Sequence, residues 1–278
     1  MIKLVVDSTA DLPHALYREY DITVVPVLAQ FGAETLRDDI DFTRDEFYTR
    51  LVASPEPPKT AAPSVGMFET AFRSLADAGH QILSLSLAGG LSGTYNAARQ
   101  AAALVEGATI TCVDSYTVIH AAGLPDAQSR PGHPRWRHAR SGRRAGRAPA
   151  YEQHAVRGLR NPALPREGRA DRPMRALLGS MLSVKPIMEV RLSEVLPLEQ
   201  VRTWKRVPPR MIELAQARGS FDQLGVLYTT TRGSAEQLAD LCAAAGLMPR
   251  EQIYVQQAGG VLGTHAGPGA LGLAGLLK

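Results

Sequence analysis

Short apolar runs alternate with amphipathic stretches along the first 120 residues. Because Val65, Phe68, Phe72 and Leu75 recur at helical spacing, residues 64–79 are predicted to form an amphipathic helix. The alternation of strand and helix indicates a parallel sheet with helices on both faces. The strands are predicted at 2–7, 22–31, 81–87 and 108–118 and the helices at 9–20, 43–54, 64–79 and 93–105.

The C-terminal part has a different order of elements. Residues 183–201 read as two strands joined by a turn, which indicates an antiparallel pair. A helix is expected in the second half of residues 202–218, and strand, helix and strand then follow up to residue 257. A capping box at Ser234 and Gln237 is expected to open the second of these helices. We therefore expect an α/β protein with two domains and a ligand between them. Residues 1–160 would form a parallel-sheet α/β/α domain and residues 161–278 a second α/β domain with a largely antiparallel sheet.

Residues 125–173 break this pattern, since arginine, proline, glycine and histidine dominate and apolar periodicity is nearly absent. Such composition predicts loop or disorder. Residues 129–175 hold thirteen arginines against three acids, a net charge of +10, so the rest of the chain carries −6 of the total of +4. A basic nucleic-acid-binding arm is one interpretation. The interpretation we favour is translation of a GC-rich gene in the wrong reading frame, because regular patterning returns abruptly at residue 176.

Composition narrows the class of protein further. Apolar residues make up 45% and charged residues 21%, as in soluble globular proteins. No apolar run reaches the roughly 18 residues of a membrane-spanning helix, and Asp7 interrupts the N-terminal apolar run too early for a signal peptide. Cys112 and Cys242 are expected to be small buried side chains in a reducing, cytoplasmic environment rather than a disulfide.

Four loops beside predicted strands carry candidate chemistry, because open α/β sheets bind ligands at strand ends. In the loop at 89–94, Gly89 and Gly90 allow close backbone approach, and Ser92, Gly93 and the following amides lie where a helix begins. With no lysine after it, this loop suits a carboxylate better than a triphosphate. The other three loops are 7–11, which contains Ser8 and either caps a helix or contributes to a site, 59–64, which presents Thr60, and 259–269.

His265 lies in the last of these loops, which reads as a glycine-rich turn, so it is expected to face a ligand as hydrogen-bond donor or general base. Arg202 is a candidate contact for an anion or a partner, or simply a solvated charge. The acidic group at 38–41 lacks histidine or glutamate at ligand spacing, so a solvated turn is favoured over a metal site. We expect no metal and no cofactor.

Together these loops resemble the DegV family of bacterial fatty-acid-binding proteins. The resemblance covers most of the chain outside 125–173, in family order, and the pairing of "LSGTY" with "GTHAGPGA" is its most specific part. The matching pieces are "DSTADLP" (7–13), "KTAAPSVGMFE" (59–69), "GGLSGTYNAA" (89–98), "LLGSMLSVKPIM" (177–188), "VRTWKR" (201–206) and "GTHAGPGALG" (263–272).

The resemblance implies a fatty acid buried between two domains, with Thr60, Ser92 and His265 as carboxylate contacts. It also implies, for some members, a role as the acyl-carrying subunit of a fatty acid kinase, in which a separate ATP-binding partner phosphorylates the carboxylate. Two departures stand out. Ala61-Ala62 replaces the family's usual serine and glutamine, and "LPREGRADRPMR" (164–175) replaces an "LRRGGRI"-like stretch. The arginine that this stretch supplies in the family for partner or ligand contact is therefore not assigned to a residue here.

The energetics of lipid binding are consistent with these residues. Burial of about fourteen methylenes, as in palmitate, is worth about 11 kcal/mol before binding costs, so hydroxyls and amides need only orient the headgroup. The expected lining is Met67, Phe68, Leu91, Met181, Leu182, Ile187 and Val261.

Two other functions remain open at this point. A serine hydrolase would use Ser92 as nucleophile, His265 as base and Asp7 or Asp114 as the orienting acid, although G-x-S-x-G is absent. A nucleic-acid binder would use the arginine-rich segment, but we expect neither nucleic acid nor an integral membrane segment.

Overall fold

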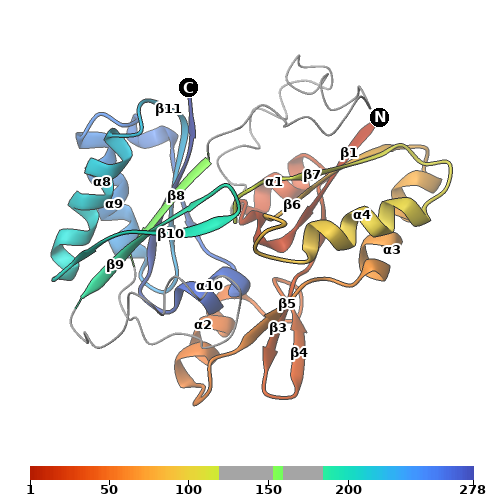
Figure 1. The fold of residues 1–278 in the computed structure, drawn as a ribbon, viewed down its shortest axis with the longest axis horizontal. Helices are drawn as coiled ribbons and strands as arrows, with labels where there is room; N and C mark the ends of the chain where they lie inside the picture. Colours follow the sequence, from red (N-terminus) through yellow and green to blue (C-terminus); the bar gives the residue numbers. More distant parts are fainter. Residues whose placement is uncertain (119–152, 159–183) are drawn as a thin grey trace.

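The computed structural model describes residues 1–118, 153–158 and 184–278, the middle range by its backbone alone. Residues 1–118 are called the N-terminal half here, and the other two ranges the C-terminal half. The halves lie side by side, each with its own main sheet (Figure 1). None of the helices in the described ranges is long and apolar enough to cross a membrane.

The N-terminal half is built on a four-stranded parallel sheet of order β2-β1-β6-β7, as expected. Successive residues of a strand face opposite sides, so Val5 packs under α3 and α4 while Val6 joins α1 and residues of the C-terminal half. The elements are β1 (Ile2–Asp7), β2 (Thr23–Val25), β6 (Gln81–Ser86), β7 (Ile110–Asp114), η1 (Ser8–Ala10), α1 (His14–Glu19), α3 (Val65–Asp77) and α4 (Thr94–Leu104).

A small antiparallel sheet of order β4-β3-β5 lies beneath the junction of the halves in Figure 1, beside α2. Its strands are β3 (Leu28–Phe31), β4 (Glu34–Arg37) and β5 (Lys59–Ala61), and α2 (Arg44–Ala53) opens with the expected capping box of Thr43 and Glu46. The single strand predicted at 22–31 is therefore wrong. Pro26 lacks the N–H that a continuous ladder needs, and the chain passes there from one sheet to another.

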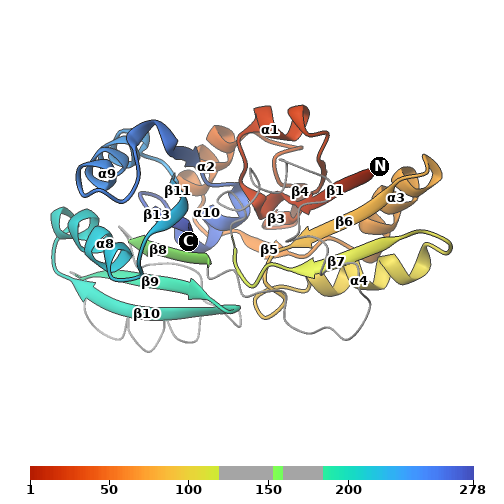
Figure 2. The ribbon, with the colours of Figure 1, turned by 90° about the horizontal axis from the view of Figure 1, so that it is seen from above.

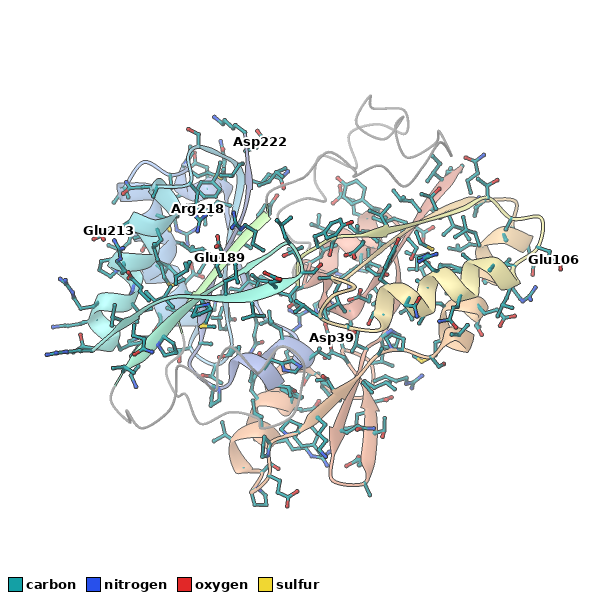
Figure 3. The ribbon with its side chains drawn as sticks, viewed as in Figure 1. Asp39, Glu106, Glu189, Glu213, Arg218 and Asp222 are labelled. Atoms are coloured by element: carbon teal, nitrogen blue, oxygen red, sulfur yellow. The ribbon has the colours of Figure 1, made fainter. Side chains whose placement is uncertain are left out.

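The C-terminal half is built on a six-stranded sheet of order β10-β9-β8-β13-β11-β12, antiparallel except for the parallel pair β11 and β12. Helices α8 and α9 cover one face around Met211, Leu224 and Leu238. Glu189 of β9 is buried and its carboxylate pairs with Arg218 at 2.8 Å (Figure 3). The elements are β8 (Gln153–Gly158), β9 (Lys185–Arg191), β10 (Glu194–Val201), β11 (Phe221–Tyr228), β12 (Ile253–Gln257), β13 (Leu271–Leu277), η4 (Trp204–Arg206), η5 (Arg250–Gln252), α8 (Val207–Gln216), α9 (Arg232–Ala244) and α10 (Gly260–Ala266).

Three local expectations need correction. Helix α9 begins at Arg232, before Ser234, so the second capping box is absent. Residues 59–61 form strand β5 rather than loop, because they pair with β3. The segment 125–173 is not wholly irregular, since β8 at 153–158 pairs with both β9 and β13. Hydrogen bonding to a strand on each side gives these residues an extended conformation, although their composition predicts loop or disorder. The rest of 125–173, like Met181 and Leu182, lies outside the described residues.

The domain boundary at residue 160 remains a prediction. Because β8 belongs to the sheet of the C-terminal half, a boundary before residue 153 fits the strand pairing better. The two halves meet through an apolar cluster, called the shared cluster here. Its buried members are Val6, Ala10, Leu12 and Ile22 from one half and Met188, Val190, Val195, Leu227, Ala266, Ala270 and Ala274 from the other.

Candidate functional site

Thr60 and His265 meet at the junction of the two halves. Strand β5 holds Thr60 opposite Ala29 of β3, and α10 holds His265 near its C-terminal end. The Thr60 hydroxyl and His265 Nε2 lie 3.0 Å apart, and both side chains are half-buried. Two predicted site residues 205 positions apart in sequence are thus brought into hydrogen-bond contact.

Ser92 lies in the turn that connects β6 to α4. The backbone N–H of Ser92 donates to the Ala88 carbonyl at 3.1 Å, and the Ser92 hydroxyl lies 2.8 Å from that of Thr94. A Cβ atom on Gly93 would lie 3.6 Å from the Cβ of Ala62, two residues after Thr60. The Ser92 turn therefore packs against the residue that follows β5, the strand whose Thr60 contacts His265.

Ser8 and Asp7 tie the first loop to its neighbours. The Ser8 hydroxyl donates to Asp38 at 2.8 Å and accepts from the Val27 N–H at 3.1 Å. The Asp7 carboxylate accepts from the N–H groups of Thr9 at 3.0 Å and Leu87 at 2.7 Å. Asp7 is thus the predicted cap, and the ligand-binding role of Ser8 remains a prediction.

Arg202 lies far from this group. The turn between β9 and β10 reaches the N-terminal half, where the Ser193 N–H donates to the Tyr116 carbonyl at 3.0 Å. Arg202 is exposed and follows the opposite end of β10. In Figure 2 this strand runs from the junction of the halves to the outer edge of the C-terminal half. A strand of 8 residues spans about 26 Å, so Arg202 is not part of the Thr60 and Ser92 group.

The expected glycine-rich turn around His265 is a short helix, α10. Glycine disfavours helix, but here it permits close packing. A Cβ atom on Gly260 would lie 2.8 Å from the Phe47 ring, and one on Gly263 would lie 2.5 Å from the Tyr48 hydroxyl. Tertiary contacts with α2 therefore outweigh local propensity.

The acidic group at 38–41 is not the solvated turn predicted. Asp38 is fully buried, and its carboxylate accepts from the Gly260 N–H at 3.0 Å. Asp11 is also fully buried and accepts from the Gly259 N–H at 2.7 Å. Burial raises the pKa of Asp11 to about 8 and that of Asp38 to about 6.

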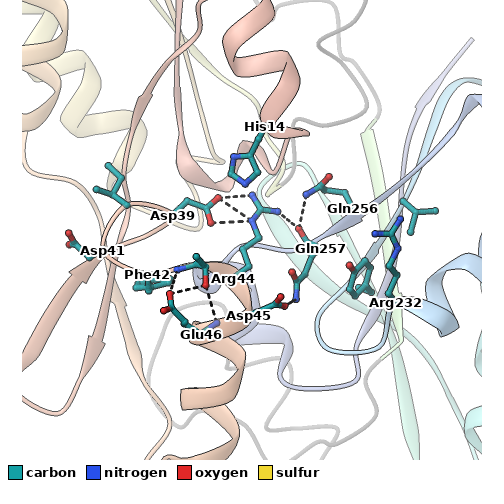
Figure 4. Close-up of a pocket in the computed structure, with 14 residues that line it drawn as sticks. His14, Asp39, Asp41, Phe42, Arg44, Asp45, Glu46, Arg232, Gln256 and Gln257 are labelled. Atoms are coloured by element: carbon teal, nitrogen blue, oxygen red, sulfur yellow. Dashed lines mark hydrogen bonds and ion pairs between the residues drawn. The ribbon is translucent and has the colours of Figure 1, made fainter.

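The Arg44 guanidinium joins this acidic group to the C-terminal half. It contacts Asp11 at 3.2 Å. It also contacts Asp39 at 2.7 Å and donates to the Gln257 carbonyl (Figure 4). Asp11 belongs to the candidate loop 7–11, whereas Asp38 was expected in a solvated turn and Arg44 was not predicted to contribute to a site. The glycine pair at 259 and 260, one residue after β12, was a usable signal, since paired glycines near a strand end indicate close approach by another group.

A polar cleft of about 490 Å³ opens beside Arg44 (Figure 4). His14, Asp45 and Arg232 are among the residues around it, but none of the predicted site residues is. Its carboxylates already have partners, such as Arg37 for Asp41 and Thr43 for Glu46. The cleft is therefore distinct from the Thr60 and His265 pair and from the Ser92 turn, which the sequence chemistry favours.

An apolar cavity of about 30 Å³ lies beside α10, at the shared cluster. Leu262 and Ala266 of α10 line it, one turn apart and on either side of His265 in sequence. Of the expected lining residues, Leu91 packs against the shared cluster, whereas Phe68 and Ile187 lie in the separate cores of the two halves. The cavity is also lined by Val118, Val190, Leu227, Tyr228, Thr229, Ala258, Ala270, Leu271 and Gly272.

The arrangement offers hydroxyls, an imidazole and backbone N–H groups beside an apolar interior. Such donors can orient a carboxylate. The hydroxyl group that contacts His265 Nε2 is that of Thr60, whereas the Ser92 hydroxyl contacts the hydroxyl of Thr94. Asp7 and Asp114 hold backbone N–H groups of Leu87 and Gly89. These contacts do not assemble the nucleophile, base and acid that the hydrolase alternative needs.

Comparison with known proteins decides the family. The family model described as "Uncharacterised protein, DegV family" matches residues 1–125 and 160–278. The chain belongs to the DegV family. A DegV domain-containing protein of Halalkalibacterium halodurans is 30% identical, with 98% of this chain and 97% of the relative covered. Protein DegV of Bacillus subtilis is 27% identical, with 100% and 99% covered.

Solved DegV structures share the fold. The crystal structure of Bacillus subtilis DegV, described as a fatty acid binding protein, superposes with a TM-score of 0.81 at 25% identity, covering 100% of this chain and 99% of that one. A DegV family protein from Thermus thermophilus gives a TM-score of 0.83 at 24% identity, covering 100% and 99%. The predicted α/β fold with a parallel sheet and a largely antiparallel sheet is confirmed.

Proposed function

We propose that this DegV family protein binds a long-chain fatty acid, such as palmitate, and catalyses no reaction on it alone. The observation that carries the proposal is the contact of 3.0 Å between Thr60 and His265, made beside the Ser92 turn and next to the shared cluster. The description of the Bacillus subtilis relative as a fatty acid binding protein supports it.

The carboxylate is held by Thr60, Ser92 and His265, with the Gly93 backbone N–H as a further donor. Hydrogen bonds to a charged group are worth about 1.5–3 kcal/mol each. The Thr60 and His265 side chains already lie together, so little ordering is needed when the headgroup binds. These contacts fix where the headgroup lies, and the tail supplies most of the affinity.

The acyl tail lies in the shared cluster, where both halves contribute apolar side chains. A cavity of about 30 Å³ holds about one water molecule, so the side chains around Leu227 and Ala266 must part to admit a chain. Burial of about fourteen methylenes, worth about 11 kcal/mol, can drive that rearrangement.

Replacing Thr60 with valine tests the headgroup site. The variant keeps the shape of the side chain but loses the Thr60 hydroxyl that contacts His265, so we expect fatty acid affinity to fall about 10- to 100-fold. Titration with a fluorescent fatty acid measures this. Thr35→Val, on β4 of the same small sheet, is the matched control and should bind like the wild type.

Equal affinity of the wild type and Thr60→Val would contradict the headgroup assignment. Mass spectrometry of lipid extracted from the purified wild type tests the ligand class directly. Ser92→Ala separates the carrier from the hydrolase, since a carrier loses some binding and a hydrolase loses essentially all turnover.

The bound fatty acid is presented to an ATP-dependent kinase partner in the cytoplasm. The carboxylate would attack the terminal phosphate of ATP held by that partner, forming an acyl phosphate and ADP. Arg202 is exposed and distant from the headgroup residues, so it is available to an acidic surface of the partner.

Reversal of the Arg202 charge separates the two roles. We expect Arg202→Glu to leave fatty acid affinity unchanged, because Arg202 lies at the far end of β10, and to weaken partner binding about tenfold. Surface plasmon resonance with a fatty acid kinase subunit from a DegV-containing bacterium measures the second effect, with Arg232→Glu on α9 as control. Equal loss in both variants would make the effect one of net charge.

A further inference from the structure

Two buried carboxylates of the N-terminal half cap a helix of the C-terminal half. Asp11 and Asp38 accept the N–H groups of Gly259 and Gly260 at 2.7 and 3.0 Å, where α10 begins. Both carboxylates are fully buried. The first N–H groups of a helix need outside acceptors, and here the acceptors come from more than 200 residues away.

The fit between these groups is tight. A Cβ atom on Gly259 or on Gly260 would lie 2.9 Å from the nearer carboxylate oxygen, so glycine alone permits this approach. Asp38 is held in turn by the Ser8 hydroxyl at 2.8 Å. The start of α10 therefore has little freedom to shift while Asp11 and Asp38 remain in place.

Arg44 closes the arrangement from the other side. The Arg44 side chain is 6% exposed, and its guanidinium bridges Asp11 and Asp39. It also donates to the Gln257 carbonyl, two residues before Gly259 (Figure 4). The strand end and the start of α10 are thus both held by the N-terminal half.

We propose that Asp11, Asp38 and Arg44 are positioning residues that lock α10 against the N-terminal half and so hold His265 against Thr60. The inference rests on the proposed function insofar as His265 contacts the fatty acid. It goes beyond that function because it makes the headgroup site depend on docking of the two halves, through residues that do not touch the ligand.

Asp38→Ala removes the acceptor of both the Gly260 N–H and the Ser8 hydroxyl. In the ligand-free protein, we expect amide hydrogen exchange across Gly260–Ala266 to speed up about tenfold or more, while α3 and α4 exchange as in the wild type. The His265 ring signals in NMR should shift and broaden, and fatty acid affinity should fall about tenfold. Asp38→Asn keeps an acceptor oxygen and should restore most of the protection.

Asp41→Ala is the matched control, because Asp41 pairs with Arg37 on the same turn and should change neither α10 exchange nor affinity. If Asp38→Ala does not fold, Arg44→Lys serves instead, since it keeps the charge and loses the fork to Asp39 and Gln257. Wild-type exchange and affinity in Asp38→Ala would overturn the inference. Exchange and NMR are measured without lipid, so absence of fatty acid binding by the wild type would overturn the proposed function alone.

Discussion

Replacing Gly263 with alanine is expected to lower the free energy of unfolding by about 1–3 kcal/mol and to reduce fatty acid affinity at least about tenfold. The new Cβ atom would lie 2.5 Å from the Tyr48 hydroxyl oxygen and 2.7 Å from the ring carbon Cε1. Tyr48 is 4% exposed and donates to the Ala258 carbonyl at 2.9 Å, so the ring has little room to move. The helix must shift away from α2 instead, and His265 moves with it.

Gly233→Ala is the control for this experiment. Gly233 lies in α9, and a Cβ atom there meets no heavy atom within 4 Å. Alanine favours helix over glycine by up to about 1 kcal/mol, so this variant should be as stable as the wild type or slightly more stable. Urea unfolding gives stability, and lipid titration gives affinity. If Gly263→Ala matched Gly233→Ala in both, α10 would not be packed against α2 as described.

Local patterns predicted most of the elements because each pattern has one physical cause. The period of Val65, Phe68 and Phe72 reflects a single buried helix face, and α3 follows it. The side chain of each of Thr43 and Glu46 accepts the backbone N–H of the other, so their spacing alone identifies the start of α2. Such interactions span a few residues and are readable without knowledge of the fold.

The site was readable only in part, because its remaining interactions span the whole chain. A hydroxyl at Thr60 and an imidazole at His265 are unusual in their loops, so residue type alone drew attention to them. Asp38 was misjudged because a carboxylate in an acidic turn normally faces water. Its partner Gly260 lies 222 positions away, and nothing within the turn signals that the pair exists.

Helix α10 failed as a prediction for the same reason. Gly260 and Gly263 are poor helix formers, and the helix forms because α2 supplies Phe47 and Tyr48 as packing partners while Asp38 accepts the Gly260 N–H. Local propensity and tertiary packing conflict here, at the element that carries His265. Such conflict is expected where a sequence is constrained by function.

Stability is expected to fall as the pH rises from about 4 to about 8, through Asp11. Burial is the main cause that raises the pKa of Asp11 from 3.8 to about 8; Arg44 opposes this, and Asp38 and Asp39 add to it. Between these two pKa values the folded protein holds a proton on Asp11 that the unfolded chain has lost. The stabilising contribution is therefore complete below pH 4 and lost as the pH passes about 8, at up to about 1.4 kcal/mol per pH unit.

Asp11→Asn isolates this effect from other titrating groups. Asparagine keeps an acceptor for the Gly259 N–H but has no proton to lose, so its stability should depend less on pH than that of the wild type. The groups that face Asp11 remain the same in both proteins, namely Arg44, Asp38, Asp39, Tyr17 and Tyr48. Urea unfolding at pH 5, 6, 7 and 8 measures the difference in slope. Identical slopes would mean that Asp11 is ionised in the folded protein throughout this range, with Arg44 compensating its burial in full.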